Sequence, residues 1–228
     1  MAKSPCSKRR QPLGPVPDYI ALDRDATRWA SVLNIHLAVA YFDPLLGVLG
    51  KTIRETAATI ESAETTQDVD LEYIEGSGCE LVENLLGVAF VVCQRFIGDV
   101  ERLAIKVLKA KGADDALWDR KRLRQRGPTL PSGLSQVLVL DAAANLYKHG
   151  SKWAAWKTAK KPEDDPNVLL ALGISEDAVG EQLRDVSEAL GNTDYHDTAV
   201  FTHILTVWGK EMEDYVWSVP QSSSGERK

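Results

Sequence analysis

The feature that most constrains the fold is residues 80–111, where apolar side chains recur at helical spacing on nearly every side. One face carries Leu81, Leu85, Val88, Val92, Phe96, Val100, Leu103 and Val107, and another carries Leu86, Ala89, Phe90, Cys93 and Ile97. A helix that is apolar nearly all round has to be covered by other helices, so it is expected at the centre of a bundle. Gly76 and Gly78 are expected to break the chain just before it.

Helical periodicity also predicts helices over residues 24–42, 43–62, 134–149, 176–190 and 198–217. The pair Asp43-Pro44 fits the start of the second of these, although it could instead be a kink in one long helix. Residues 112–133 and 167–172 are expected to hold short helical turns. No stretch alternates apolar and polar residues, so we expect no sheet. The predicted fold class is an all-α bundle of five to seven helices with a long central helix.

The length of 228 residues suits a single helical domain, predicted over residues 18–217. Flexible tails are expected at both ends, a basic one at 1–17 and a polar one at 218–228. The basic tail has no apolar run behind its charges, which argues against a secretory signal. Three cysteines without a Cys-x-x-Cys pair favour reduced thiols and a cytoplasmic location. No uninterrupted apolar run reaches roughly 18 residues, so no membrane contact is expected.

A net charge of −6 argues against a protein that coats nucleic acid nonspecifically, but the basic residues are clustered. One cluster spans residues 120–126 and a second spans 148–161, where aromatic side chains could stack on unpaired bases. The candidate RNA contacts are Arg122, Arg124, Lys152, Trp153 and Trp156. A solvated charged face explains the same clusters equally well.

The predicted helix 134–149 carries an unusual set of polar residues. At about 100° per residue, Asp141, Asn145, Lys148, His149 and Lys152 fall in one arc, opposite an apolar face. Such an arc can form a site or simply meet water. Two histidines elsewhere, His196 and His203, stand seven residues apart, about 10 Å along a helix, which is too far for a shared metal ion. No metal or cofactor is expected.

The sequence Ala144-Asn-Leu-Tyr-Lys-His149 lies late in this helix. It resembles the motif of the HEPN superfamily, which is an arginine, a polar residue beside it, three variable residues and a histidine. The resemblance implies a helical protein of a prokaryotic defence or toxin system, acting on RNA without metal and dimerising with its motif helices facing. His149, Asn145 and Lys148 would form the site, with His149 as general acid or base.

Ala144 stands where that motif has its arginine, whose planar fork would hold a phosphate. Lys148, one turn away, provides a cation but only as a point charge. The alternative is therefore a non-catalytic helical interaction or scaffold module, in which the Trp153 and Trp156 region and the last helix bind a protein partner.

Overall fold

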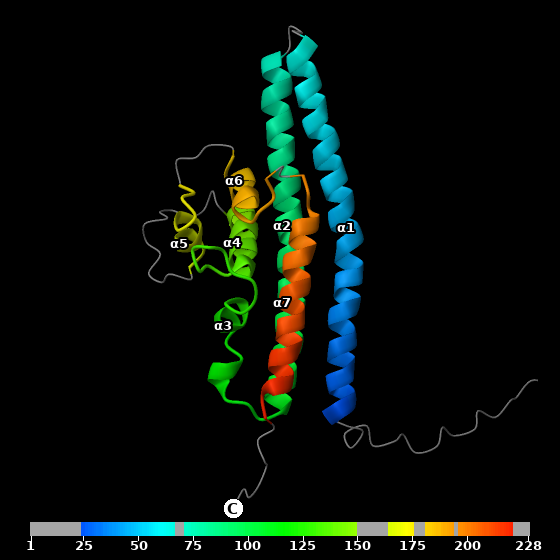
Figure 1. The fold of residues 1–228 in the computed structure, drawn as a ribbon, viewed down its shortest axis with the longest axis vertical. Coiled ribbons are helices and arrows are strands. Elements are labelled where there is room, and N and C mark those ends of the chain that lie inside the picture. Colours follow the sequence, from blue (N-terminus) through cyan, green and yellow to red (C-terminus); the bar gives the residue numbers. More distant parts are fainter. Residues whose placement is uncertain (1–23, 67–70, 150–163, 176–180, 194–195, 221–228) are drawn as a thin grey trace, which may run out of the picture.

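A computed structural model describes residues 24–66, 71–149, 164–175, 181–193 and 196–220 (Figure 1). The helices are α1 (Arg24–Thr66), α2 (Leu71–Ala110), α3 (Arg120–Arg124), α4 (Gln136–His149), α5 (Asp165–Leu170), α6 (Gln182–Ala189) and α7 (Ala199–Ser218), with a 3-10 turn, η1, at Asp115–Leu117. Within the described ranges no strand occurs, and only an isolated bridge joins Thr129 to Ser135. The prediction of an all-α bundle is confirmed. Both predicted tails, apart from residues 218–220, lie outside the described residues.

The two longest helices, α1 and α2, form an antiparallel pair against which the other helices pack (Figure 1). α1 runs through Pro44 without ending, so the prediction of two helices over 24–42 and 43–62 is wrong. The alternative of one long helix is correct. A proline in a helix removes one backbone hydrogen bond, and the packing of a 43-residue helix along α2 and α7 outweighs that loss.

The start of α2 is a second correction. The helix begins at Leu71 and runs through Gly76 and Gly78, which were expected to break the chain. A Cβ atom on Gly78 would lie 2.6 Å from Cγ1 of Ile60 on α1, so glycine at this position allows the two helices to approach closely. Tertiary packing therefore overrides the low helix propensity of glycine here.

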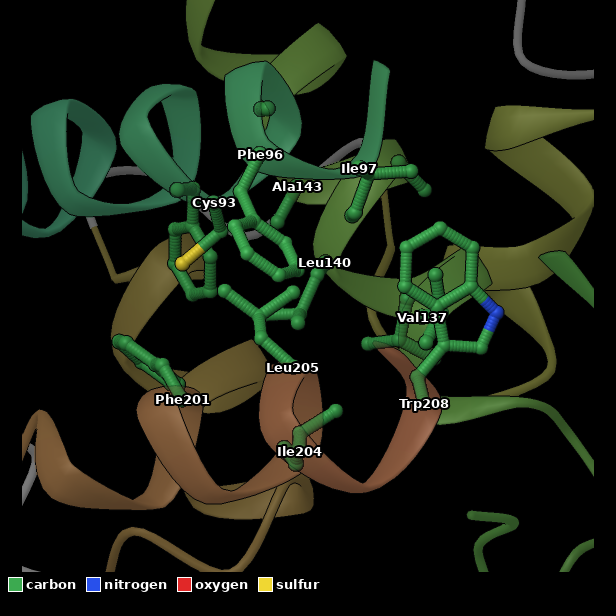
Figure 2. Packing of buried hydrophobic residues seen from close by; sticks show 14 of the residues in the cluster. Cys93, Phe96, Ile97, Val137, Leu140, Ala143, Phe201, Ile204, Leu205 and Trp208 are labelled. Atoms are coloured by element: carbon green, nitrogen blue, oxygen red, sulfur yellow. The ribbon is translucent and has the colours of Figure 1, made fainter. Parts of the chain in front are cut away.

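The hydrophobic core lies where α2, α4 and α7 meet (Figure 2). Figure 2 shows Cys93, Phe96 and Ile97 of α2 facing Val137, Leu140 and Ala143 of α4 and Phe201, Leu205 and Trp208 of α7. The indole nitrogen of Trp208 donates a hydrogen bond to the carbonyl of Leu123, at 3.1 Å, which ties α7 to α3. The apolar face of α7 is thus part of the core, so the partner surface expected on this helix is not available there.

α2 is covered on most sides but not on all of them. Leu81 and Val88, expected among its packed apolar residues, are 48% and 41% exposed. The segment Gly76–Ala110 is also long and apolar enough to cross a membrane by length and composition, a property that buried core helices share. Many of its side chains, from Val82 to Leu108, lie in the core. The expectation of no membrane contact stays a prediction.

The C-terminal end of α1 and the N-terminal end of α2 extend beyond the rest of the bundle (Figure 1). We call residues 55–66 of α1 and 71–83 of α2 the hairpin arm. Glu83 marks the point where the arm leaves the bundle, because its carboxylate accepts hydrogen bonds from the backbone N–H groups of Leu183 and Arg184 at the start of α6, both at 3.1 Å. Burial raises the pKa of Glu83, although these bonds and Arg184 oppose the shift.

Candidate functional site

The polar face of α4 packs into a network of hydrogen bonds and ion pairs between α2, α3 and α5. Asp141 and Asn145 are one helical turn apart on α4, so both side chains point to the same side of the helix. The members of this α4 network are Gln94 and Glu101 of α2, Arg124 of α3, Asp141, Asn145 and Lys148 of α4, and Asp165 of α5.

Arg124 is the centre of the buried half of the α4 network. Its guanidinium donates to both carboxylate oxygens of Glu101, at 2.5 and 3.1 Å, and to Oδ2 of Asp141. Glu101 is 1% exposed and Asp141 is 3% exposed, so each carboxylate depends on these donors in place of water. Two buried carboxylates on one guanidinium form a fixed cross-link between α2, α3 and α4.

The pKa values of this pair reflect burial and charge. Burial raises the pKa of Glu101, and the charge of Asp141 adds to this shift, while the hydrogen bonds and charge of Arg124 oppose it. Burial disfavours the charged form of Arg124, but its bonds with Glu101 and the charge of Asp141 outweigh that effect and raise its pKa. The guanidinium therefore remains a cation that is committed to these two carboxylates.

The half-buried part of the α4 network is built from amides. Gln94 donates from Nε2 to Oδ1 of Asp141 and to Oδ1 of Asn145, both at 2.8 Å, and accepts from Lys148 at Oε1. Asn145 in turn donates from Nδ2 to Asp165 at 2.9 Å. Burial raises the pKa of Asp165, and the charge of Asp141 adds to the shift, whereas the bond from Asn145 opposes it.

The residues of the HEPN-like motif occupy three different environments. Ala144 is fully buried, Asn145 is half-buried in the α4 network, and His149 is exposed at the last position of α4. Ala144 and His149 are five residues apart, which places them about 140° apart around the helix axis. This separation follows from the spacing of the motif in any helix, so the feature that the structure adds is the burial of position 144. An arginine at position 144 would have to fit into the core.

The predicted RNA contacts are distributed differently from what the sequence suggested. Arg124 is turned inward into the α4 network, with 19% of its side chain exposed, so it does not offer a cation to a phosphate. Arg122, on the same helix, is exposed and donates to the carbonyl of Ala116 at 3.3 Å. Lys152, Trp153 and Trp156 lie outside the described residues.

Sequence reasoning missed the contribution of α2 to this site. Gln94 and Glu101 are seven residues apart on the most apolar helix, and both are flanked by core positions such as Cys93 and Val100. A polar residue in such surroundings requires a polar partner, and this was the signal that could have identified them. Which partner they meet is a tertiary contact that spacing along the chain does not reveal.

A cavity of about 160 Å³ lies between α1 and the start of α7. Its charged and titratable lining comprises Asp43, Lys51, Arg54, His196 and Asp197. Two carboxylates face two cations there, so the cavity favours no ion of one sign. Among the described residues no group of histidine, cysteine and carboxylate side chains is arranged to hold a metal ion.

Comparison of this chain with protein-family models, with curated proteins and with solved structures found no significant match. The class that fold and site define is therefore an all-α bundle with a buried polar network.

Proposed function

We propose that this protein is a non-catalytic helical interaction module. The observation that carries the proposal is that two of the three side chains expected to form the site, Asn145 and Lys148, are already hydrogen-bonded within the α4 network. The third, His149, is exposed and is not a member of this network. Both ends of the Asn145 amide are used, and the Lys148 ammonium donates to Gln94. A general base needs a partner group that positions the substrate, and the buried Ala144 beside Asn145 supplies none.

The distribution of exposed apolar side chains supports a binding role. Five of the eight large hydrophobic residues exposed in the described ranges lie on α1 and α2: Tyr41, Leu45, Val48, Leu81 and Val88. The first three stand at positions i, i+4 and i+7, so they form one strip along α1, which we call the α1 strip. Such a strip on a long helix is suited to bind another helix.

An RNA cleavage assay tests the absence of catalysis. The wild-type protein and the His149→Ala variant are incubated with a mixed RNA pool and excess chelator, so that contaminating metal nucleases are inactive. We expect no cleavage by either protein. Cleavage by the wild type alone would overturn the proposal in favour of the HEPN-like ribonuclease. That ribonuclease activity and the homodimer that the resemblance implies both stay predictions.

A partner assay tests the binding role itself. The wild-type protein and a Tyr41→Glu/Val48→Glu variant are used as bait in cells that make the protein, and the associated proteins are identified by mass spectrometry. We expect a defined partner to be lost with this variant and retained with Leu170→Glu, which alters an exposed leucine on α5. The proposal is wrong if both variants retain the same partners as the wild type.

A further inference from the structure

The charge of the hairpin arm differs from that of the rest of the chain. No lysine, arginine or histidine occurs between Arg54 and Arg95, and nine acidic residues do. All 27 lysine and arginine residues of the chain lie outside this stretch. Nine carboxylates without a cation along 40 residues produce a negative potential that extends about 8 Å into solvent at physiological salt.

Only some carboxylates of the arm are paired within the described part of the chain. Glu61 on α1 and Glu80 on α2 are exposed and make no ion pair in the described part of the chain. Glu55 and Glu83 differ, because Glu55 pairs with Lys51 at 3.7 Å and Glu83 pairs with Arg184 at 3.5 Å at the base of the arm. In the described part of the arm, the carboxylates of Glu55 and Glu83 at its base are therefore paired, whereas those of Glu61 and Glu80 are not.

An apolar surface lies beside this charge on the same helix. Leu81 and Val88 are seven residues apart, so they lie on one face of α2, and Asn84 is between them. Tyr147 of α4 is 39% exposed at the edge of this surface, with its ring against Gly87, where a Cβ atom would lie 2.2 Å from the ring. We call Leu81, Asn84, Val88 and Tyr147 the α2 strip.

We propose that the α2 strip and the acidic hairpin arm together bind a cationic amphipathic helix of a partner protein. This inference rests on the proposed interaction function and names the chemistry of a partner that binds at a second surface, separate from the α1 strip. The apolar face of such a helix would cover Leu81 and Val88, and its lysine and arginine side chains would reach Glu61 and Glu80. Charge complementarity argues for this occupant over RNA, whose phosphates the arm repels.

The geometry fits a third helix added to a two-helix hairpin. α1 and α2 already pack closely at Gly78, and beyond Glu83 no other described helix covers the arm (Figure 1). Apolar anchors at positions i and i+7 on α2 match the two-turn repeat of a helix that packs along it. The flanking carboxylates would set its orientation and increase the rate of encounter.

The test uses the full chain and a fluorescent 21-residue peptide of leucine and lysine with a helical apolar face. A second peptide of the same composition, in scrambled order, lacks that face. We expect the patterned peptide to bind at least about tenfold more tightly than the scrambled one, and to lose about tenfold in affinity when salt rises from 50 to 300 mM. Equal binding of both peptides would show unspecific charge attraction and would overturn the proposal.

Matched variants locate the binding surface. Leu81→Asn/Val88→Asn removes the exposed apolar anchors, and Leu45→Asn/Val48→Asn makes the same change on the α1 strip. We expect about tenfold weaker binding from the first variant and less than about twofold from the second. Glu61→Gln/Glu80→Gln should reduce both the affinity and its dependence on salt. Circular dichroism confirms that each variant is folded, because all six positions are exposed.

If both apolar variants lose peptide affinity equally, or if neither loses any, the peptide does not bind at the α2 strip and the proposal is overturned. The proposal would also be overturned if the wild-type protein self-associates and the Leu81→Asn/Val88→Asn variant does not. The α2 strip would then bind a second copy of this chain. Failure of this inference differs from failure of the proposed function. If the α1 strip variant loses a cellular partner while the patterned peptide does not bind at the α2 strip, the interaction function stands and only the arm is removed from it.

Discussion

Replacing Arg124 with methionine should destabilise the fold more than most substitutions of a partly exposed residue. The methionine keeps much of the apolar stem and removes the guanidinium that serves Glu101 and Asp141. Glu101, 1% exposed, then has no other hydrogen-bond donor among the described residues, and Asp141 retains only the amide of Gln94. The change therefore leaves buried carboxylates without their cation.

Removing one partner of a buried ion pair costs about 3–5 kcal/mol. In a domain of this size each kcal/mol lowers Tm by about 2–4 °C, so the expected decrease in Tm is about 6–20 °C. Protonation limits the loss, because a buried carboxylate without its cation takes up a proton more readily. The pKa of this carboxylate in the folded state therefore rises above its value in the unfolded chain. Its destabilising effect on the fold grows as pH rises and disappears at pH values below its ordinary pKa. The difference from the wild type should therefore be smaller at pH 5 than at pH 7.

Urea denaturation followed by circular dichroism measures the free energy of unfolding of wild type, Arg124→Met and Arg122→Met. The Arg122 variant is the matched control, because this exposed neighbour lies on the same helix and its loss should cost less than about 0.5 kcal/mol. The combined Arg124→Met/Glu101→Gln variant should lose less than the sum of its two single changes. A loss below about 1 kcal/mol for Arg124→Met at pH 7 would refute the reasoning.

Further predictions concern single side chains elsewhere in the bundle. Gly87→Ala should destabilise the fold by about 1–3 kcal/mol, because the new methyl group meets the ring of Tyr147. Gly47→Ala should stabilise α1 by about 0.5–1 kcal/mol, because a Cβ atom there meets no neighbouring atom within 4 Å. Urea denaturation measures both changes. Burial raises the pKa of Asp165, so its contribution to stability is present at low pH and is lost as pH rises through that raised pKa. Asp165→Asn should therefore make the unfolding free energy less dependent on pH above the ordinary pKa of an aspartate, and an unchanged pH profile would contradict this. Lys111 donates from Nζ to backbone carbonyls at the end of α7, so Lys111→Met should cost about 1–3 kcal/mol and speed hydrogen exchange in the last turn of that helix.

The sequence pattern predicted most helices because their apolar faces repeat at helical spacing. The errors occurred where a contact between distant residues decided the outcome. Gly78 indicated a break, but its missing side chain is what lets Ile60 of α1 pack against α2. Pro44 indicated a helix start, but α1 continues because the residues on both sides of it pack into the same bundle, as Phe42 and Leu46 do.

The site was predicted in part. The arc of polar residues on α4 was recognised, and Asp141 and Asn145 do act together there. The arc was expected to face a substrate or water, whereas its first member is buried. Arg124 was assigned to a basic surface because it follows other cations along the chain, but a five-residue helix distributes neighbours to opposite sides. Its partner Glu101 lies 23 residues away, and no local pattern connects the two.

One uninterrupted helix, α2, carries both the exposed Leu81 and the buried Glu101. At about 1.5 Å per residue these positions are about 30 Å apart on the same rod. A small tilt of α2 imposed at the arm would displace the carboxylate of Glu101 relative to Arg124, where the bonds tolerate only tenths of an ångström. The bonds of Glu83 to the start of α6 lie between the arm and Glu101, so they would resist such a tilt before it reaches the contacts of Arg124.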